Sequence, residues 1–289
     1  MGKIKVRKYL VDELRRQYEV GHGVSRFKVK DTTTNHSDLI HSHNTWQTYT
    51  AQARHFADWC KSRGITDPDE GRQNVPEYIQ TLLDDGKSIA TVKTALAALS
   101  HGYKCRMTDW DVKIPTMTRS QIKRSRFPAV RDRNFSEANN RLLITFGDCS
   151  GLRRSELEAL HGDDLLIADS GQVYLHVESG KGGKSRDVAL YGSPDEIEAI
   201  VSACQTAGRA LVWPRVHSAY DEHSHRAVYA CRLYREMARP IEQLPPSRRY
   251  VCRKDFRGKI YDKDALSYIS HKLGHNRLNV IVDHYLYNL

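Results

Sequence analysis

Apolar residues recur every three or four positions through the first half of the chain, which is the spacing of one helical face. The clearest set is Trp46, Tyr49, Ala53, Phe56 and Trp59. A further helix is expected near Pro76, because proline fits a first turn, and another after Ser88, which can cap it. We expect a helical domain over residues 43–110. A short helix near 8–18 lies in residues 1–42, which we treat as an N-terminal arm.

The pattern changes in the second half, where strand-like runs stand between helical segments. Residues 111–133 are rich in Lys and Arg and contain two prolines, which predicts a basic linker. Two strand-like runs, 173–177 and 186–190, enclose a turn-rich loop. Helices are expected after Ser136 and over 154–160, 194–207, 224–238, 262–274 and 277–286. Residues 134–289 are therefore predicted to be a mainly helical domain with a small β-sheet.

Composition narrows the function. The 289 residues include 45 Lys and Arg against 35 Asp and Glu, a formal net charge of +10. Such an excess attracts polyanions, so nucleic acid is a natural partner, although an anionic membrane surface or solubility would also account for it. No stretch approaches the ~20 apolar residues of a membrane helix, and we expect no membrane partner. The six cysteines form no Cys-x-x-Cys pair, which argues against a structural zinc site and favours a reducing cytoplasm.

Five short segments carry the candidate chemistry. They are Gly151-Leu152-Arg153-Arg154-Ser155-Glu156-Leu157, Gly180-Lys181-Gly182, His223-Ser224-His225-Arg226, Leu273-Gly274-His275 and Tyr285. Each is weak alone, because an arginine at a helix start is usually a surface residue and a glycine-lysine turn is usually a hairpin tip. The turn also lacks the spacing of a phosphate-binding P-loop. The five segments occur in this order within one predicted domain, and together they indicate a function far more specifically than any one of them does alone.

Together these segments resemble the sequence boxes of the tyrosine recombinase family, the phage-type integrases. The family's G-L-R-x-S-E-L box is intact at 151–157, which makes Arg153 the first catalytic arginine. The other catalytic residues that the resemblance implies are Lys181, His223, Arg226, His275 and the nucleophile Tyr285. It also implies the fold, which is a helical core-binding (SAM-like) domain followed by a tyrosine-recombinase catalytic domain.

The resemblance implies site-specific recombination of double-stranded DNA through a 3′-phosphotyrosine intermediate, for integration or excision of a mobile element. Two guanidiniums suit the attacked phosphate, because they are permanently charged and donate hydrogen bonds in pairs. A free tyrosine has a pKa near ~10 and needs help to lose its proton, for which His223 is the candidate base. In the family the lysine protonates the leaving 5′-oxygen, and no metal or other cofactor takes part.

The family also implies an assembly and a setting. The expected partners are paired recombination sites, three further copies of the chain in a homotetramer, and an accessory directionality factor, in the bacterial cytoplasm at the nucleoid. Two alternatives remain. A non-catalytic DNA-binding protein of the same fold would not need the whole catalytic set. A type IB topoisomerase uses the same nucleophile, but it relaxes supercoils without paired sites.

Several assignments within the site stay open. Tyr287 lies about 200° around a helix from Tyr285, so only one of them can face the phosphate. Its spacing from His275 favours Tyr285. His225, inside the third box, either supports the site or simply packs. The catalytic lysine could be Lys184 in place of Lys181. The first catalytic arginine could be Arg154 in place of Arg153.

Two basic stretches are candidates for DNA contacts, with solvated loops as the alternative. The linker candidates are Lys113, Arg119, Lys123, Arg124 and Arg126. The interval between Arg226 and His275 is longer than is usual in the family, and basic and aromatic side chains interleave over 248–259. We expect a β-hairpin there that lies along DNA. Its phosphate-contacting candidates are Arg248, Arg249, Arg253 and Lys254.

We predict that changing these four hairpin cations to glutamine weakens the salt dependence of DNA binding. Each phosphate contact that is lost removes counterion release, so the slope of log K against log salt falls by ~0.9 per contact. Titration of labelled duplex DNA at several salt concentrations measures the slope. An unchanged slope would show that these four side chains do not contact DNA phosphates.

Overall fold

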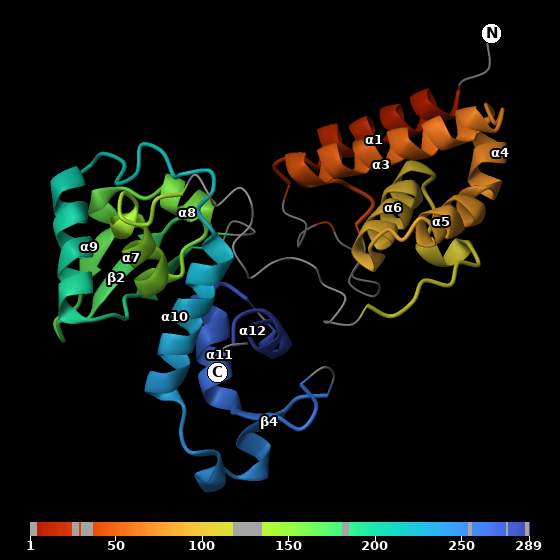
Figure 1. The fold of residues 1–289 in the computed structure, drawn as a ribbon. Coiled ribbons are helices and arrows are strands. Elements are labelled where there is room, and N and C mark those ends of the chain that lie inside the picture. The colour runs from red at the N-terminus through yellow and green to blue at the C-terminus, as the bar shows by residue number, and fades with distance from the viewer. Residues whose placement is uncertain are drawn as a thin grey trace. The chain divides into compact units, whose positions relative to one another are not determined.

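The computed structural model describes residues 5–24, 29, 37–117, 135–180, 185–253, 256–275, 277–286 and 289. Within these ranges the chain is mainly helical with small antiparallel sheets, which confirms the predicted fold class. Figure 1 shows two compact units, Met1–Lys123 and Arg124–Leu289. Each unit has its own hydrophobic core. No helix in the described ranges is both long and apolar enough to cross a bilayer.

The regular elements described in the first unit are all helices. They are α1 (Val6–Gly21), α3 (His43–Ser62), α4 (Pro68–Gln73), α5 (Val75–Asp84), α6 (Ile89–Gly102) and a 3-10 turn at Met107–Asp109. Ser42 and Ser88 immediately precede α3 and α6. Their hydroxyl oxygens accept hydrogen bonds from the backbone N–H groups of Thr45 and Thr91. Each cap satisfies an N–H group that has no partner within its helix, which explains where these helices begin.

Helix α1 is part of the first unit's core. It packs on α3 and α6, and its side chains Leu10 and Leu14 are fully buried. Gly102 of α6 permits the close approach, because a Cβ atom there would lie 2.7 Å from a methyl carbon of Leu10. Gln17 adds a polar tie, donating to the His101 carbonyl at 2.8 Å. The segment expected to form an arm thus contributes a buried helix to this unit.

The second unit combines helices with two small sheets. Its helices are α7 (Arg141–Ser150), α8 (Arg154–Glu158), α9 (Pro194–Ala207), α10 (Glu222–Met237), α11 (Lys263–Lys272) and α12 (Leu278–His284). Its strands are β1 (Leu165–Ile167), β2 (Val173–Val177), β3 (Arg186–Ala189), β4 (Arg249–Val251) and β5 (Ile260–Asp262). Short 3-10 turns lie at Gly162–Asp164, Ile241–Gln243 and Pro246–Arg248.

Both sheets are antiparallel. The first has the order β1-β2-β3, with Leu175 of β2 paired to Val188 of β3. In the second, β4 pairs with β5, so the hairpin expected around 248–259 is present. Helix α10 runs through the middle of the unit and packs against α7 and α11. Its buried Tyr229 donates a hydrogen bond to the Ala189 carbonyl at 2.8 Å, which ties α10 to the end of β3.

We predict that Leu10→Ala lowers the free energy of unfolding of the first unit by ~2–5 kcal/mol, because it removes a buried side chain and leaves a cavity. Val20→Ala on the same helix is the matched control, since Val20 is 55% exposed. Urea unfolding followed by tryptophan fluorescence measures both variants. If Leu10→Ala matched the control, α1 would not belong to this core.

Candidate active site

The G-L-R box forms a sharp corner between α7 and α8. Gly151 ends α7 in the left-handed conformation, with φ of 59°, and a Cβ atom there would lie 2.5 Å from the Tyr229 ring. Only glycine satisfies both constraints. Arg153 then precedes α8, where its backbone N–H donates to Glu156 at 2.8 Å and its guanidinium donates to the same carboxylate at 2.9 Å. The box therefore fixes Arg153 from both its backbone and its side chain.

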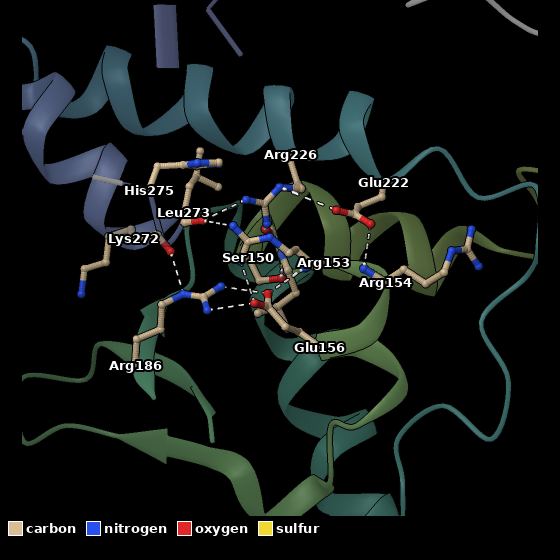
Figure 2. Close-up of polar contacts among 12 residues, drawn as sticks. Ser150, Arg153, Arg154, Glu156, Arg186, Glu222, Arg226, Lys272, Leu273 and His275 are labelled. Atoms are coloured by element: carbon tan, nitrogen blue, oxygen red, sulfur yellow. Dashed lines mark hydrogen bonds and ion pairs between the residues drawn. The ribbon is translucent and has the colours of Figure 1, made fainter. Parts of the chain in front are cut away.

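Two arginines from separate boxes converge on one carbonyl oxygen, that of Leu273 (Figure 2). The distances are 2.9 Å from Arg153 and 3.0 Å from Arg226. Arg226 is fully buried, donates also to the Gly151 carbonyl, and has its Nε atom 4.0 Å from the Glu222 carboxylate. Burial, and then the charge of Arg226, lower the pKa of Arg153. The structure thus joins the first, third and fourth boxes at one cationic site.

The predicted nucleophile lies at the same place. The Tyr285 hydroxyl is 3.1 Å from Nε2 of His275, which is hydrogen-bonding distance. The Tyr285 ring lies over the Arg226 guanidinium, with 5.6 Å between the guanidinium carbon and the ring centroid. Tyr285 is itself buried. The ring is therefore one of the groups that surround the buried Arg226 guanidinium.

The two histidines of the third box differ in their contacts. His223 lies in the first turn of α10, one helical turn before Arg226, and is exposed. His225 is 2.8 Å from the Asp148 carboxylate of α7, and its ring stacks on Tyr220 at a centroid distance of 4.8 Å. These contacts give His225 a packing role between α7 and α10.

Arg154 uses its side chain in a different way from its neighbour Arg153. Its guanidinium donates to backbone carbonyls over residues 216–220, including those of His217 at 2.8 Å and Tyr220 at 2.9 Å. Its backbone N–H donates to Glu222 at 2.9 Å. Arg154 therefore anchors the loop that precedes α10, and in Figure 2 its guanidinium points away from the arginine cluster. Arg153 is the arginine of this box that joins the cluster.

Two residues of the cluster were not among the sequence candidates. Glu156 is 5% exposed, and Arg186 on β3 donates to its two oxygens at 2.9 and 2.8 Å. Arg186 also donates to the Lys272 carbonyl at 3.1 Å. The fixed place of Glu156 in the G-L-R-x-S-E-L box was an available signal. Arg186 had none, because its carboxylate partner is 30 residues away in the sequence.

Several sequence candidates cannot be placed. Those outside the described residues are Lys181, Lys184, Arg119, Lys123, Arg124, Arg126, Lys254 and Tyr287. Among the remaining DNA-contact candidates, Lys113 and Arg253 are exposed. Arg248 is exposed and pairs with Asp264 at 2.8 Å, while Arg249 is half-buried and donates to a backbone carbonyl at 2.9 Å.

The arrangement suits an anionic phosphate. Two fixed guanidiniums supply charge and hydrogen-bond donors, and an imidazole lies beside a tyrosine hydroxyl that can act as a nucleophile. Across the described ranges no group of three or more His, Cys, Asp and Glu side chains is arranged to hold a metal ion.

The Glu156 carboxylate gives a test of this geometry. Burial raises the pKa of Glu156, but hydrogen bonds from Arg186 and from the Arg153 backbone outweigh it and lower the pKa from 4.5 to about 2. A lowered carboxylate pKa stabilises the fold above the unfolded value, and this stability is lost as pH falls from 4.5 towards 2. We predict that Glu156→Gln weakens the pH dependence of unfolding free energy below pH 4.5. Urea unfolding across this range measures it.

The matched control is Glu158→Gln, because Glu158 is exposed on the same helix. It should leave the pH profile close to that of the unaltered chain. Equal profiles for the two variants would show that Glu156 is not held as an ionised carboxylate.

No protein-family model matches the chain. It is 25% identical over 199 residues to the integrase/recombinase XerD homolog of Selenomonas ruminantium. This alignment covers 60% of the chain and 57% of the relative, so the chain spans little more than half the length of the curated relative that it matches.

Two solved structures share the fold over nearly the whole chain. One is the XerH site-specific recombinase bound to palindromic difH substrate as a post-cleavage complex, with a TM-score of 0.60 and 16% identity. It covers 99% of this chain and 94% of that one. The other is XerH bound to difH substrate as a pre-cleavage complex, with a TM-score of 0.55 and 16% identity, covering 98% and 94%. The sequence boxes thus resemble those of the tyrosine recombinases, their residues converge at one site, and the chain shares the fold of the XerH recombinase.

Proposed function

We propose that this chain is a site-specific DNA recombinase, which cleaves and rejoins strands through a 3′-phosphotyrosine bond to Tyr285. The observation that carries the proposal is the convergence of Arg153, Arg226, His275 and Tyr285 at one place. These residues come from sequence boxes far apart in the chain. A fold that served only to bind DNA would not require a tyrosine ring over a buried guanidinium and its hydroxyl beside a histidine.

The reaction begins when the Tyr285 oxygen attacks a DNA phosphorus and the bond to the 5′-oxygen breaks. Negative charge grows on the non-bridging oxygens, where Arg153 and Arg226 donate hydrogen bonds from fixed positions. Because these donors are already oriented by backbone carbonyls and carboxylates, little reorganisation is needed as the charge develops. The new phosphotyrosine bond keeps the energy of the broken bond, so a second strand can be joined without a nucleotide triphosphate.

Proton transfer completes the step. His275 already lies 3.1 Å from the Tyr285 hydroxyl and can share its proton. We assign His223 as the base, or as part of a shared network with His275, because it lies one helical turn from Arg226. Lys181 is proposed to protonate the leaving 5′-oxygen, on the family resemblance alone.

DNA entry requires a local rearrangement. Arg226 is fully buried with the Tyr285 ring over it, so the phosphate and the ring compete for the same face of the guanidinium. We propose that the ring swings off Arg226 as the phosphate arrives, which also brings its hydroxyl to the phosphorus. Buried Ile281 and Val282 hold α12 in the core, so the movement is confined to the end of that helix.

The proposed substrate is double-stranded DNA with paired inverted sites, bound by a homotetramer at the bacterial nucleoid, with an accessory directionality factor. XerH is described as bound to difH substrate before and after cleavage, which supports duplex DNA as the ligand. The charge of +10 favours the same partner, because basic side chains on phosphates supply most sequence-independent affinity. Integration or excision of a mobile element is the biological role that we propose.

Covalent trapping tests the proposal. The unaltered chain, Tyr285→Phe and Tyr287→Phe are expressed in a host that carries the DNA flanking the gene. After denaturing lysis, protein still bonded to DNA is isolated and the attached ends are sequenced. We expect adducts at paired inverted sequences from the unaltered chain and Tyr287→Phe, and none from Tyr285→Phe, because phenylalanine has no attacking oxygen.

The other outcomes separate the alternatives. If adducts are lost only with Tyr287→Phe, the nucleophile is Tyr287 and not Tyr285. Adducts without sequence preference would indicate a type IB topoisomerase. Normal non-covalent DNA binding with no adduct from any version would indicate a non-catalytic DNA-binding protein.

A further inference from the structure

Arg186 connects three segments that build the active site. It begins β3, its two terminal nitrogens donate to Glu156 near the start of α8, and its Nε donates to the Lys272 carbonyl at the end of α11 (Figure 2). Gly274 packs against this arrangement, since a Cβ atom there would lie 3.2 Å from Arg153 Nη1 and 3.6 Å from Arg186 Cζ. The side chain of Arg186 is thus enclosed by the same boxes that place the two phosphate-binding arginines.

The Glu156 carboxylate is shared unequally between two arginines. Oε1 accepts from Nη1 of Arg153 and from Nη1 of Arg186, both at 2.9 Å. Oε2 accepts from the Arg153 backbone and from Nη2 of Arg186, both at 2.8 Å. Arg186 therefore makes the bidentate pair, which is the stronger geometry, while the Arg153 guanidinium gives Glu156 a single hydrogen bond.

This sharing matters because Glu156 is a buried charge. Its side chain is 1% exposed, so it must be neutralised by a partner within the protein. Without Arg186, the guanidinium that the described residues still place beside it is that of Arg153. Arg153 would then form the bidentate pair itself, which would turn its donors towards Glu156 and cancel its charge.

The charge balance supports the same conclusion. The cluster contains the guanidiniums of Arg153, Arg186 and Arg226 and the carboxylates of Glu156 and Glu222. Three positive and two negative groups leave one positive charge, which is opposite to the single negative charge of a phosphodiester. After burial, which raises it, hydrogen bonding from Arg186 is the largest influence on the pKa of Glu156, and it lowers that pKa.

We propose that Arg186 is a positioning residue for strand cleavage, which neutralises and holds Glu156 so that the charge and donors of Arg153 remain available to the DNA phosphate. Arg186 does not touch the phosphate in this arrangement, since its donors are directed to Glu156 and Lys272. The inference rests on the proposed function, because it concerns the phosphate that Arg153 would bind.

The test compares the full-length chain with Arg186→Met, Glu156→Met and the double variant. The probe is a nicked duplex carrying the DNA end that the unaltered chain traps, and the readouts are the rate of adduct formation, duplex affinity and thermal unfolding. Arg209→Met is the control for loss of one positive charge, since Arg209 is exposed in the same unit. It should leave the adduct rate within about threefold of the unaltered chain, because it removes one exposed charge, which water and salt screen.

We expect Arg186→Met to slow adduct formation by ~100-fold, a loss comparable to that of one oriented donor at a developing charge. Duplex affinity should change by less than about threefold, since it depends on many phosphate contacts. The double variant should recover at least ~10-fold of the rate lost by Arg186→Met, because the unpaired carboxylate that captures Arg153 is gone. A purely structural role would not restore the rate when a second buried residue is removed.

Two results would overturn the inference. One is an unaltered adduct rate in Arg186→Met, and the other is a double variant whose losses are the product of the two single losses. If Arg186→Met lacks a folding transition, Arg186→Lys is compared with the unaltered chain. It should be slower by ~10-fold, because an ammonium cannot form the bidentate pair, and an equal rate would reject the inference. Absence of adducts from the unaltered chain would instead reject the proposed function.

Discussion

The carbonyl oxygen of Leu273 is the point on which the active-site geometry depends. Two guanidiniums of like charge lie close together only where negative partial charges and carboxylates surround them. Leu273 supplies one such oxygen to both Arg153 and Arg226, and the Gly151 carbonyl supplies another to Arg226. Because backbone carbonyls do not ionise, this part of the arrangement is insensitive to pH. The three sequence boxes are thereby joined through main-chain atoms.

Glycine explains why these carbonyls are in position. Gly151 and Gly274 both have positive φ angles, of 59° and 67°, and each ends or follows a helix beside the cluster. The left-handed turns expose helix C-terminal carbonyls, which helices leave without internal partners. Arginine side chains satisfy them. The arginines of the site are therefore held by carbonyl groups that the ends of two helices leave without backbone partners.

Much of the fold could be predicted because its signals are local. Ser42 and Ser88 mark helix starts through caps within three residues, and the spacing of apolar side chains identifies the helices between them. The roles of Arg154 and Arg186 could not be predicted in this way. Arg154 contacts carbonyls more than sixty residues away, and the carboxylate partner of Arg186 is 30 residues away. Arg153 and Arg154 are chemically identical neighbours, and only the directions of their side chains in the structure distinguish their roles.

The position of the Tyr285 ring has a consequence for selectivity. With the ring over Arg226, that guanidinium is fully buried. A free phosphate or nucleotide brings few contacts of its own and gains little by displacing a packed aromatic ring. Duplex DNA gains many phosphate contacts elsewhere on a basic protein, and that remote binding energy can drive the local opening. On the proposed function, the length of the polymer rather than the chemistry of a single phosphate would then decide which anions the nucleophile meets.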